Sequence, residues 1–413
     1  MSTQTRRTAP QPALRTSAPP HDPHAHAHAH APLVPTVVVF ALTGLLVSGL
    51  MYAAIPLMDG MASDWGLPRS AATWTTTAFG LGYAIGFVLF GPLADRFGPR
   101  RVAVTGLLVG VLTSLAMTVV PGLPTALAVR GLEGLAMAAF PPCAFAYITH
   151  HGAPRHRSLM TSCLTTSFLA AAVVGQIAAQ SVGDAFGWRT VFLVWAVAVL
   201  VAAVALHRVM LPDDHTVERP LRASYARIPS LLRAPRLRPL YAATPVVYGA
   251  FAAVYTGIQL AGAIGSASGL LALRASALPV MVLIPFLTPW LRRVPALVRL
   301  VAALLLAATA IALIGALAPG TAGTAALLMV FVLGIGSSSP AVIEAVGARA
   351  GEAHPTAVSL AMFWFFVGAS IGPVAAGAVT GSGPGALMYV FAAVLTAGAL
   401  VVLTAWLRER TPR

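Results

Sequence analysis

The sequence predicts an all-α integral membrane protein whose twelve transmembrane helices form two pseudo-symmetric six-helix halves. Hydrophobic residues occupy 58% of the 413 positions, charged residues only 9%, and the mean hydropathy is +0.82. Ordinary soluble domains contain roughly 45–50% apolar residues, and a spanning helix needs about 20 of them. The apolar content is therefore enough for about a dozen spans.

Apolar runs separated by Gly, Pro or charged residues place these spans in order. The first run follows a polar tail of about thirty residues and is too long for a cleaved signal peptide, so it is interpreted as the first span. The eighth run is the least regular, because it contains Arg274 and three prolines. The predicted spans are residues 33–57, 70–92, 102–121, 124–148, 158–182, 189–210, 240–262, 269–290, 297–317, 322–346, 356–379 and 384–407.

The basic residues, all of them arginine, indicate the topology. Of the 26 arginines, 22 lie in the first tail, in the loops after the even-numbered spans and at the C-terminus. The positive-inside rule therefore places both termini in the cytoplasm of a multi-pass cell-membrane protein. The predicted parts are a disordered cytoplasmic His-rich tail (1–32), a six-helix bundle (33–210), a cytoplasmic central loop (211–239), a second six-helix bundle (240–407) and a short cytoplasmic tail (408–413).

Two pairs of similar segments support an internal duplication. The stretch "GPLADRFGPRRV" begins at Gly91 and "TPWLRRVPALVR" begins at Thr288, 197 residues later. The stretch "GQIAAQ" begins at Gly175 and "GPVAAG" begins at Gly372, at the same spacing of 197. Two separate matches at one spacing predict a repeated six-span unit.

The first of these stretches contains more polar residues than a topology anchor needs. Its glycines allow a tight turn and close helix approach, and Asp95 can face the N-terminus of a neighbouring helix. Its arginines can pair with helix C-termini, with Asp95 or with lipid phosphates. A loop that only fixes orientation would explain Arg100 and Arg101 but not Asp95 or the paired glycines.

These residues resemble the signature loop between the second and third helices of the major facilitator superfamily. The twelve spans, the long central loop and the repeat are similar to that family along nearly the whole chain after the first tail. The resemblance implies that the loop latches the two halves together in one state of a transport cycle, with Asp95 and Arg96 as gating residues. The implied gating motif is Gly91, Leu93, Asp95, Arg96, Gly98, Arg100 and Arg101.

Two further stretches resemble one branch of that family. "RGLEGLAMAAFPPCAFAYI", from Arg130, is similar to the fourth helix of the drug and metabolite proton antiporters, in which the Arg is linked to proton coupling. "GWRTVF", from Gly187, is similar to the start of that branch's sixth helix. Exporters of this branch carry a Gly-Pro-rich motif in the fifth helix, and Gln176 stands where its proline is expected. This departure keeps import open beside export.

Charged residues inside a bilayer are candidates for function by default, because each costs about 2.5–3.5 kcal/mol at the centre. Glu133 follows Arg130 by three residues and lies within pairing distance on one helix face. The pair either lines a cavity, with Gln176 and Gln180 at similar depth, or fixes helix packing. The candidates for proton coupling are Arg130, Glu133 and Glu344. The substrate-cavity candidates, on helices that line the central cavity in the resembled family or close to the Arg130 pair, are Tyr52, Gln176, Gln180, Tyr255, Gln259, Phe363 and Trp364.

Several classes of function are excluded or disfavoured. The chain contains no Lys, so it has no Walker-type nucleotide-binding segment for ATP-driven pumping. No catalytic constellation occurs, and an enzyme is not expected. Cys143 and Cys163 lack the spacing of metal ligands. The alternating histidines His21, His24, His26, His28 and His30 are interpreted as low-complexity tail rather than a metal site, so neither metal nor cofactor is expected.

The leading hypothesis is a secondary active transporter that exports a small amphipathic molecule by alternating access coupled to proton entry. The expected partners are the lipid bilayer, a small-molecule substrate and protons, with no nucleic acid, and the chain is expected to be a monomer. Proton-coupled or facilitated uptake of a metabolite is one alternative. A membrane receptor or scaffold that does not transport is the other.

Overall fold

The computed structural model describes residues 31–213, 221–260, 269, 272–273, 275–291, 293–379 and 384–410. These residues are almost entirely helical, and no strand occurs among them. The helices before the central loop are α1 (Leu33–Ala53), η1 (Ile55–Leu57), α2 (Met58–Trp65), α3 (Arg69–Ala72), α4 (Trp74–Phe97), α5 (Pro99–Met117), α6 (Leu123–Met137), α7 (Phe140–His151), α8 (Arg157–Phe186) and α9 (Trp188–Val209). Those that follow are α10 (Leu221–Ala226), α11 (Ile228–Arg233), α12 (Arg238–Leu260), α14 (Leu278–Leu291), α15 (Ala296–Leu317), α16 (Thr321–Ala350), η2 (Gly351–Ala353), α17 (His354–Val379) and α18 (Pro384–Arg410).

The predicted twelve-helix layout is confirmed. Within the described residues, ten helical segments are long and apolar enough to cross a membrane. Helix α12 and the shorter apolar helix α14 take the seventh and eighth places. Within the first part of the predicted eighth span, residues 270, 271 and Arg274 lie outside the described residues.

Several boundaries differ from the predicted ones. The predicted loop beginning at Gly91 is mostly helical, because α4 continues to Phe97 and α5 begins at Pro99. The fourth span is divided into α6 and α7, since Pro141 and Pro142 lack the N–H groups that would continue the first helix. Both prolines are instead accommodated in the first turn of α7, where these groups have no partner within a helix.

The two halves repeat the same helix packing. Helix α1 packs against α8, and α12 packs against α17 in the second half. A Cβ atom on Gly175 would lie 2.7 Å from the carbonyl oxygen of Gly49, and one on Gly372 would lie 2.3 Å from that of Gly249. The absence of a side chain at these positions therefore lets both helix pairs meet backbone to backbone. Gly175 and Gly372 are the residues that the sequence spacing of 197 had paired.

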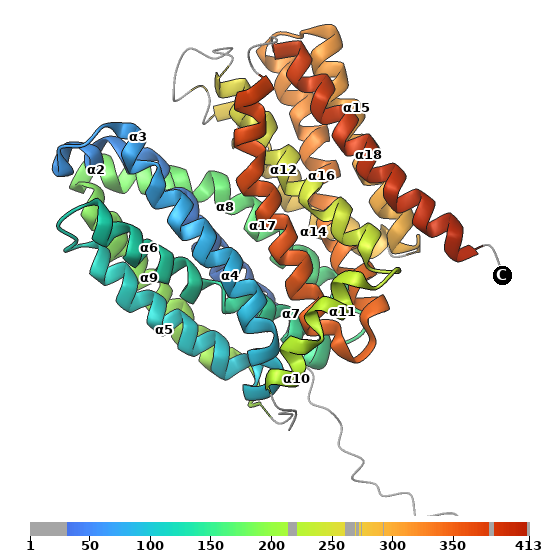
Figure 1. The fold of residues 1–413 in the computed structure, drawn as a ribbon, viewed down its shortest axis with the longest axis horizontal. Coiled ribbons are helices and arrows are strands. Elements are labelled where there is room, and N and C mark those ends of the chain that lie inside the picture. The colour runs from blue at the N-terminus through green and yellow to red at the C-terminus, as the bar shows by residue number, and fades with distance from the viewer. Residues whose placement is uncertain are drawn as a thin grey trace, which may run out of the picture.

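The halves meet at one end of the bundle and diverge at the other. In Figure 1 the helices α1–α9, in blue to green, and α12–α18, in yellow to red, approach one another near α7, α10 and α11. They separate toward the end that carries α2 and α3. We call the first end the arginine-rich end, because it carries Arg96, Arg100, Arg101, Arg155, Arg157, Arg227 and Arg233.

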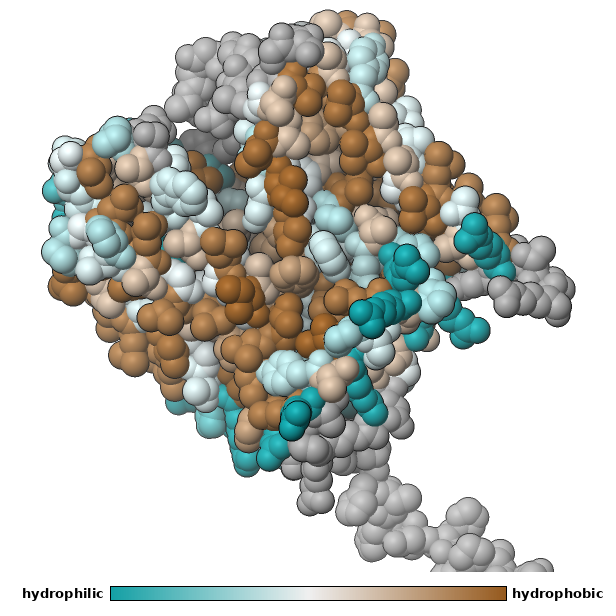
Figure 2. All heavy atoms as spheres, in the orientation of Figure 1, coloured by the Kyte–Doolittle hydropathy of each residue, from teal (hydrophilic) through white to brown (hydrophobic). Residues whose placement is uncertain are grey.

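The molecular surface fits a bilayer. Figure 2 shows a broad hydrophobic face over the helices, while hydrophilic side chains gather at the arginine-rich end and at the end of α18. Large apolar side chains such as Leu81, Leu112 and Val197 are exposed on the flanks. A continuous apolar face of this extent is expected where lipid replaces water.

Candidate functional site

Two equivalent contacts join the halves at the arginine-rich end. Gly91 of α4 packs against α17, and a Cβ atom on it would lie 2.6 Å from the hydroxyl oxygen of Ser359. On the other side of the interface, the hydroxyl groups of Ser162 in α8 and Thr288 in α14 are hydrogen-bonded at 2.7 Å. Gly91 and Thr288 are 197 residues apart, and so are Ser162 and Ser359. The repeat therefore places the same two positions of each half in the interface.

Asp95 extends the first of these contacts. It lies in the last turn of α4, and its carboxyl group accepts a hydrogen bond from the Thr356 hydroxyl in the first turn of α17. A helix N-terminus carries partial positive charge, so it stabilises a carboxylate. The candidate latch residue thus faces the other half, and the neighbouring helix that it approaches is α17.

The remaining motif residues contact a residue that sequence reasoning missed. The carboxylate of Asp213, just after α9, accepts hydrogen bonds from the backbone N–H groups of Arg100 and Arg101, both at 3.0 Å. A Cβ atom on Gly98, whose φ is 89°, would lie 2.1 Å from Cγ of Asp213. Asp213 therefore caps the N-terminus of α5, and only glycine fits at position 98.

The other residues of the motif have local contacts. The guanidinium of Arg100 donates a hydrogen bond of 2.6 Å to the carbonyl of His207. That of Arg96 lies 5.5 Å from the centre of the Phe97 ring, and Leu93 is half-buried. The turn between α4 and α5 is thus attached to the end of α9.

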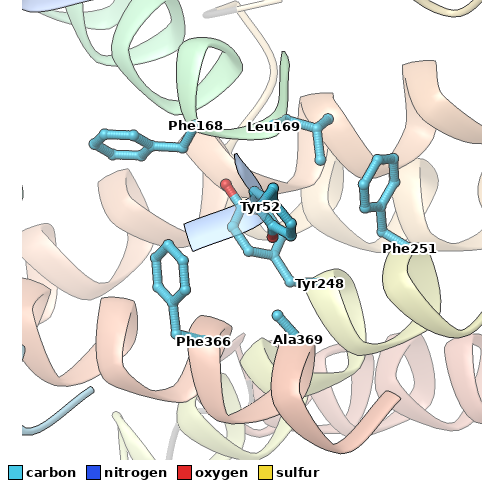
Figure 3. A pocket seen from close by; sticks show the side chains of 7 residues that line it. All are labelled: Tyr52, Phe168, Leu169, Tyr248, Phe251, Phe366 and Ala369. Carbon is cyan, nitrogen blue, oxygen red and sulfur yellow. The ribbon is translucent and has the colours of Figure 1, made fainter. Parts of the chain in front are cut away.

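Figure 3 shows a small pocket at the centre, where residues from both halves converge. Its lining residues are Tyr52, Phe168, Leu169, Tyr248, Phe251, Phe366 and Ala369. The cavity volume is about 10 Å³, which holds about one water molecule. In this conformation the aromatic side chains of the lining fill the space between the halves. We call these five residues, Tyr52, Phe168, Tyr248, Phe251 and Phe366, the central aromatic cluster.

Phe366 connects the two halves in this cluster. Its ring centre lies 4.8 Å from that of Tyr83 and 5.2 Å from that of Phe87, both on α4. On its own side it lies 6.0 Å from Tyr248 of α12. Sequence reasoning missed Phe366, although it is three residues beyond the candidate Phe363 on the same helix.

Five of the seven predicted cavity residues, all except the two glutamines Gln176 and Gln180, divide into three groups. Tyr52 lines the central pocket, and Tyr255 is buried with its ring 5.1 Å from that of Phe251. Phe363 and Trp364 contact each other at 5.3 Å and are not among the lining residues. The side chain of Gln259 lies outside the described part of the structure.

Arg130 and Glu133 form the predicted ion pair, with 2.6 Å between the nearest nitrogen and oxygen and both side chains completely buried. Arg130 also donates hydrogen bonds to the carbonyls of Leu50, at 3.1 Å, and Thr75, at 3.4 Å. The Ser114 hydroxyl donates one to Glu133 at 2.5 Å. The pair is therefore enclosed by α1, α4 and α5 within the first half.

The sequence left two interpretations of the pair open, lining a cavity together with Gln176 and Gln180 or fixing helix packing, and the contacts described here are packing contacts. Neither Arg130 nor Glu133 is a lining residue of the central pocket or of the larger cavity beside Arg157 and Glu344. Gln176 donates a hydrogen bond of 2.5 Å to the carbonyl of Ala172 on its own helix, and Gln180 is half-buried on the same helix, α8. The described bonds of the pair reach α1, α4 and α5, so the structure does not join the glutamines to it.

Glu344 lies apart from these groups, near the arginine-rich end of α16. Its half-exposed carboxylate forms an ion pair with the buried Arg299 of α15. The His-rich tail falls outside the described residues, and no cluster of three metal-ligating side chains occurs among those described.

Comparison with solved structures identifies the fold. The crystal structure of a human organic anion transporter superposes with a TM-score of 0.68, covering 90% of this chain and 99% of that one at 16% identity. At this level of identity the likeness applies to the fold.

Comparison with curated proteins finds transporters of several kinds. A Streptomyces coelicolor protein named as a probable transporter is 29% identical over 51% of this chain and 49% of its own length. The 4-hydroxybenzoate transporter of Pseudomonas aeruginosa is 28% identical over 41% of this chain and 38% of its own. A bicyclomycin resistance protein homolog of Haemophilus influenzae is 29% identical over 41% and 42%. The matches thus span less than half the length of each relative, and these relatives include both metabolite and drug-resistance proteins.

A family model extends the match over most of the chain. The model described as Major Facilitator Superfamily matches residues 40–354. This range includes the first half from Phe40 of α1 onward, the central loop and the second half as far as the start of α17. Together with the twelve-helix fold and the contacts of the motif at Gly91–Arg101, it shows that the chain belongs to the major facilitator superfamily.

Proposed function

We propose that the chain is a secondary active transporter that exports a small amphipathic molecule by alternating access, in exchange for protons. The observation that carries this proposal is the arrangement of contacts between the halves. The Gly91 and Thr288 contacts lie at one end, and the central aromatic cluster lies between the two repeated units. Rocking the halves about the cluster would break contacts at one end and form others at the opposite end.

The orientation follows from the arginine distribution. With the arginine-rich end in the cytoplasm, the contacts in this structure close the transporter toward the cytoplasm. Asp95 and Thr356 then act as a latch for this state, because their hydrogen bond can exist only when α4 and α17 are together.

The substrate class follows from the chemistry of the cluster. The side chains that line the central pocket are aromatic or aliphatic and carry no formal charge. Such a lining favours a ligand with a flat apolar body. The tyrosine hydroxyls of Tyr52 and Tyr248 supply polar positions that can orient such a ligand. Relatives named for 4-hydroxybenzoate and for bicyclomycin resistance are consistent with this class.

Glu133 is the proposed proton carrier, and its burial sets the condition for this role. Removing two charges from water is costly, and Arg130 offsets this only while the pair is intact. Protonation of Glu133 would release Arg130, so the pair has to gain access to water during the cycle. The hydrogen bonds from Arg130 to α1 and α4 would couple that event to helix movement.

The test is a comparison of wild type with Glu133→Gln in proteoliposomes, with simultaneous measurement of lumenal pH and substrate flux. The panel contains 4-hydroxybenzoate, a lipophilic drug, a sugar and a polyanion. We expect the wild type to move one of the apolar compounds with opposite proton flux. Glu133→Gln should retain substrate exchange but lose concentrative transport. Proton flux that still follows substrate in this variant would make Glu133 a structural partner of Arg130, and Glu344 the next candidate.

Uptake is the second candidate function, favoured by one observation. Gln176, where the exporters' helical proline is expected, is buried and bonded to its own helix. In the same proteoliposomes, substrate that follows protons in the same direction would indicate uptake.

A further inference from the structure

A second cavity lies between the halves at the arginine-rich end. Its volume is about 430 Å³, within the range of roughly 300–1,000 Å³ that is typical of small-molecule sites. It shares no lining residue with the central pocket. We call it the vestibule, and its lining residues are Phe145, Ile148, Thr149, Pro154, Arg157, Ser158, Thr161, Pro340, Ile343, Glu344, Gly347, Ala348 and His354.

The walls of the vestibule combine an apolar surface with hydroxyl groups. Phe145 and Ile148 of α7 face the cavity from the first half, and Ile343 of α16 faces it from the second. The hydroxyl-bearing Ser158 and Thr161 lie on the first turns of α8. Such a mixture suits a ligand with a flat apolar body and a polar group.

The charges at the cavity are not balanced. Glu344 is already paired with Arg299, a cation that lies outside the lining. Arg157 donates a hydrogen bond of 2.9 Å from Nε to the carbonyl of Gly152. Within the described residues its two terminal nitrogens make no hydrogen bond. The guanidinium is thus held in place through Nε, and its two terminal nitrogens can donate a pair of hydrogen bonds to a carboxylate.

His354 of α17 lies on the wall of the vestibule that belongs to the second half. It precedes the membrane-spanning segment Thr356–Val379, and its buried Nδ1 has no hydrogen-bond partner among the described residues. Burial, together with the positive charges of His150 and Arg157, lowers the pKa of His354 to about 4. The ring is therefore neutral at pH 7, in a region of positive potential that disfavours a second cation.

We propose that the vestibule is a second ligand site, which binds a small organic monoanion with its carboxylate at Arg157 and His354 and its apolar body against Phe145, Ile148 and Ile343. This site is separate from the central aromatic cluster. Its occupation does not depend on the direction of transport or on proton coupling. A cation of the same shape is excluded from it, since Glu344 is neutralised and Arg157 is not.

The test is isothermal titration of the purified full chain in lipid nanodiscs at pH 7. The probes are 1-naphthoate and 1-naphthylmethylammonium, which have the same ring system and opposite charge. We expect saturable binding of the anion and at least tenfold weaker binding of the cation. Arg157→Gln should weaken naphthoate binding at least tenfold, whereas Arg155→Gln, a neighbour outside the lining, should leave it unchanged.

A second variant tests the same site independently, in case Arg157→Gln does not fold. Ala348 is exposed and lines the vestibule, so Ala348→Trp fills the cavity without disturbing a buried residue. It should abolish naphthoate binding. The proposal is overturned if wild type shows no saturable binding, if the cation binds equally well, or if naphthoate binds both variants as it binds the wild type. A chain that binds naphthoate here but transports nothing would contradict the proposed function alone.

Discussion

At the scale of single residues, the structure separates two kinds of charged group. Asp95 and Asp213 each face a helix N-terminus, but Asp95 does so across the two halves and Asp213 within one of them. Arg130 and Glu133 neutralise each other inside the first half. Of these four charged groups, only Asp95 makes a contact that has to break when the halves separate at the arginine-rich end.

Asp95→Asn is therefore predicted to weaken the closed state without unfolding the protein. The amide keeps the size of the side chain but cannot carry the negative charge that the partial positive charge at the N-terminus of α17 attracts. We expect the initial transport rate to fall at least about tenfold, while the amount of protein in the membrane stays near normal. Asp184→Asn, an exposed acid on α8, is the control. Unchanged transport in Asp95→Asn would show that Asp95 does not act as a latch.

At the scale of helices, glycines decide which pairs can touch. A Cβ atom on Gly82 of α4 would lie 2.0 Å from the carbonyl oxygen of Gly131 on α6, and one on Gly134 would lie 2.1 Å from that of Phe79. These two helices are thus in backbone contact. The close approach lets Arg130, on the same stretch of α6, reach the Thr75 carbonyl of α4.

Gly134→Ala should consequently destabilise the first half. Alanine is the better helix former by about 1 kcal/mol, but its methyl group would overlap backbone that cannot move aside. Overpacking of this kind costs about 1–3 kcal/mol. We expect a lower apparent melting temperature in detergent, whereas Gly122→Ala, where nothing lies within 4 Å, should change it little. Equal melting temperatures for the two variants would show that α4 and α6 can separate freely.

At the scale of the whole molecule, the repeat places matching positions at the junction of the halves. Gly91 meets Ser359, and their counterparts Thr288 and Ser162 meet on the other side. In the central pocket, Leu169 and Phe366 are again 197 residues apart. The interface therefore has the same approximate two-fold symmetry as the sequence.

If the halves rock apart at this end during transport, joining them there should stop the cycle. The test variant carries Ser162→Cys and Thr288→Cys, and both native cysteines are replaced by Cys143→Ala and Cys163→Ala. Its two new thiols lie where the hydroxyl oxygens are 2.7 Å apart in the wild type. We expect oxidation to stop transport and reduction to restore it, while each single-cysteine variant is unaffected by oxidation. Full transport by a completely cross-linked sample would show that this end does not open.

The sequence by itself determined the number, order and approximate limits of the helices, their repeat and the concentration of arginine at one end. These properties depend on local composition, because a chain in lipid has to satisfy its backbone within each helix. The equivalence of Gly175 and Gly372 in the repeat could also be predicted, because it rests on a fixed spacing along the chain. The same is true of the ion pair between Arg130 and Glu133.

Only the tertiary structure decided which side chains meet. It placed Phe366 rather than Phe363 in the central cluster, enclosed the Arg130 pair inside one half, brought Asp213 to Gly98 and left the vestibule open. Each of these outcomes depends on how helices far apart in sequence rotate against one another. That rotation is set by close packing of side chains over the whole bundle, which hydropathy and spacing do not specify.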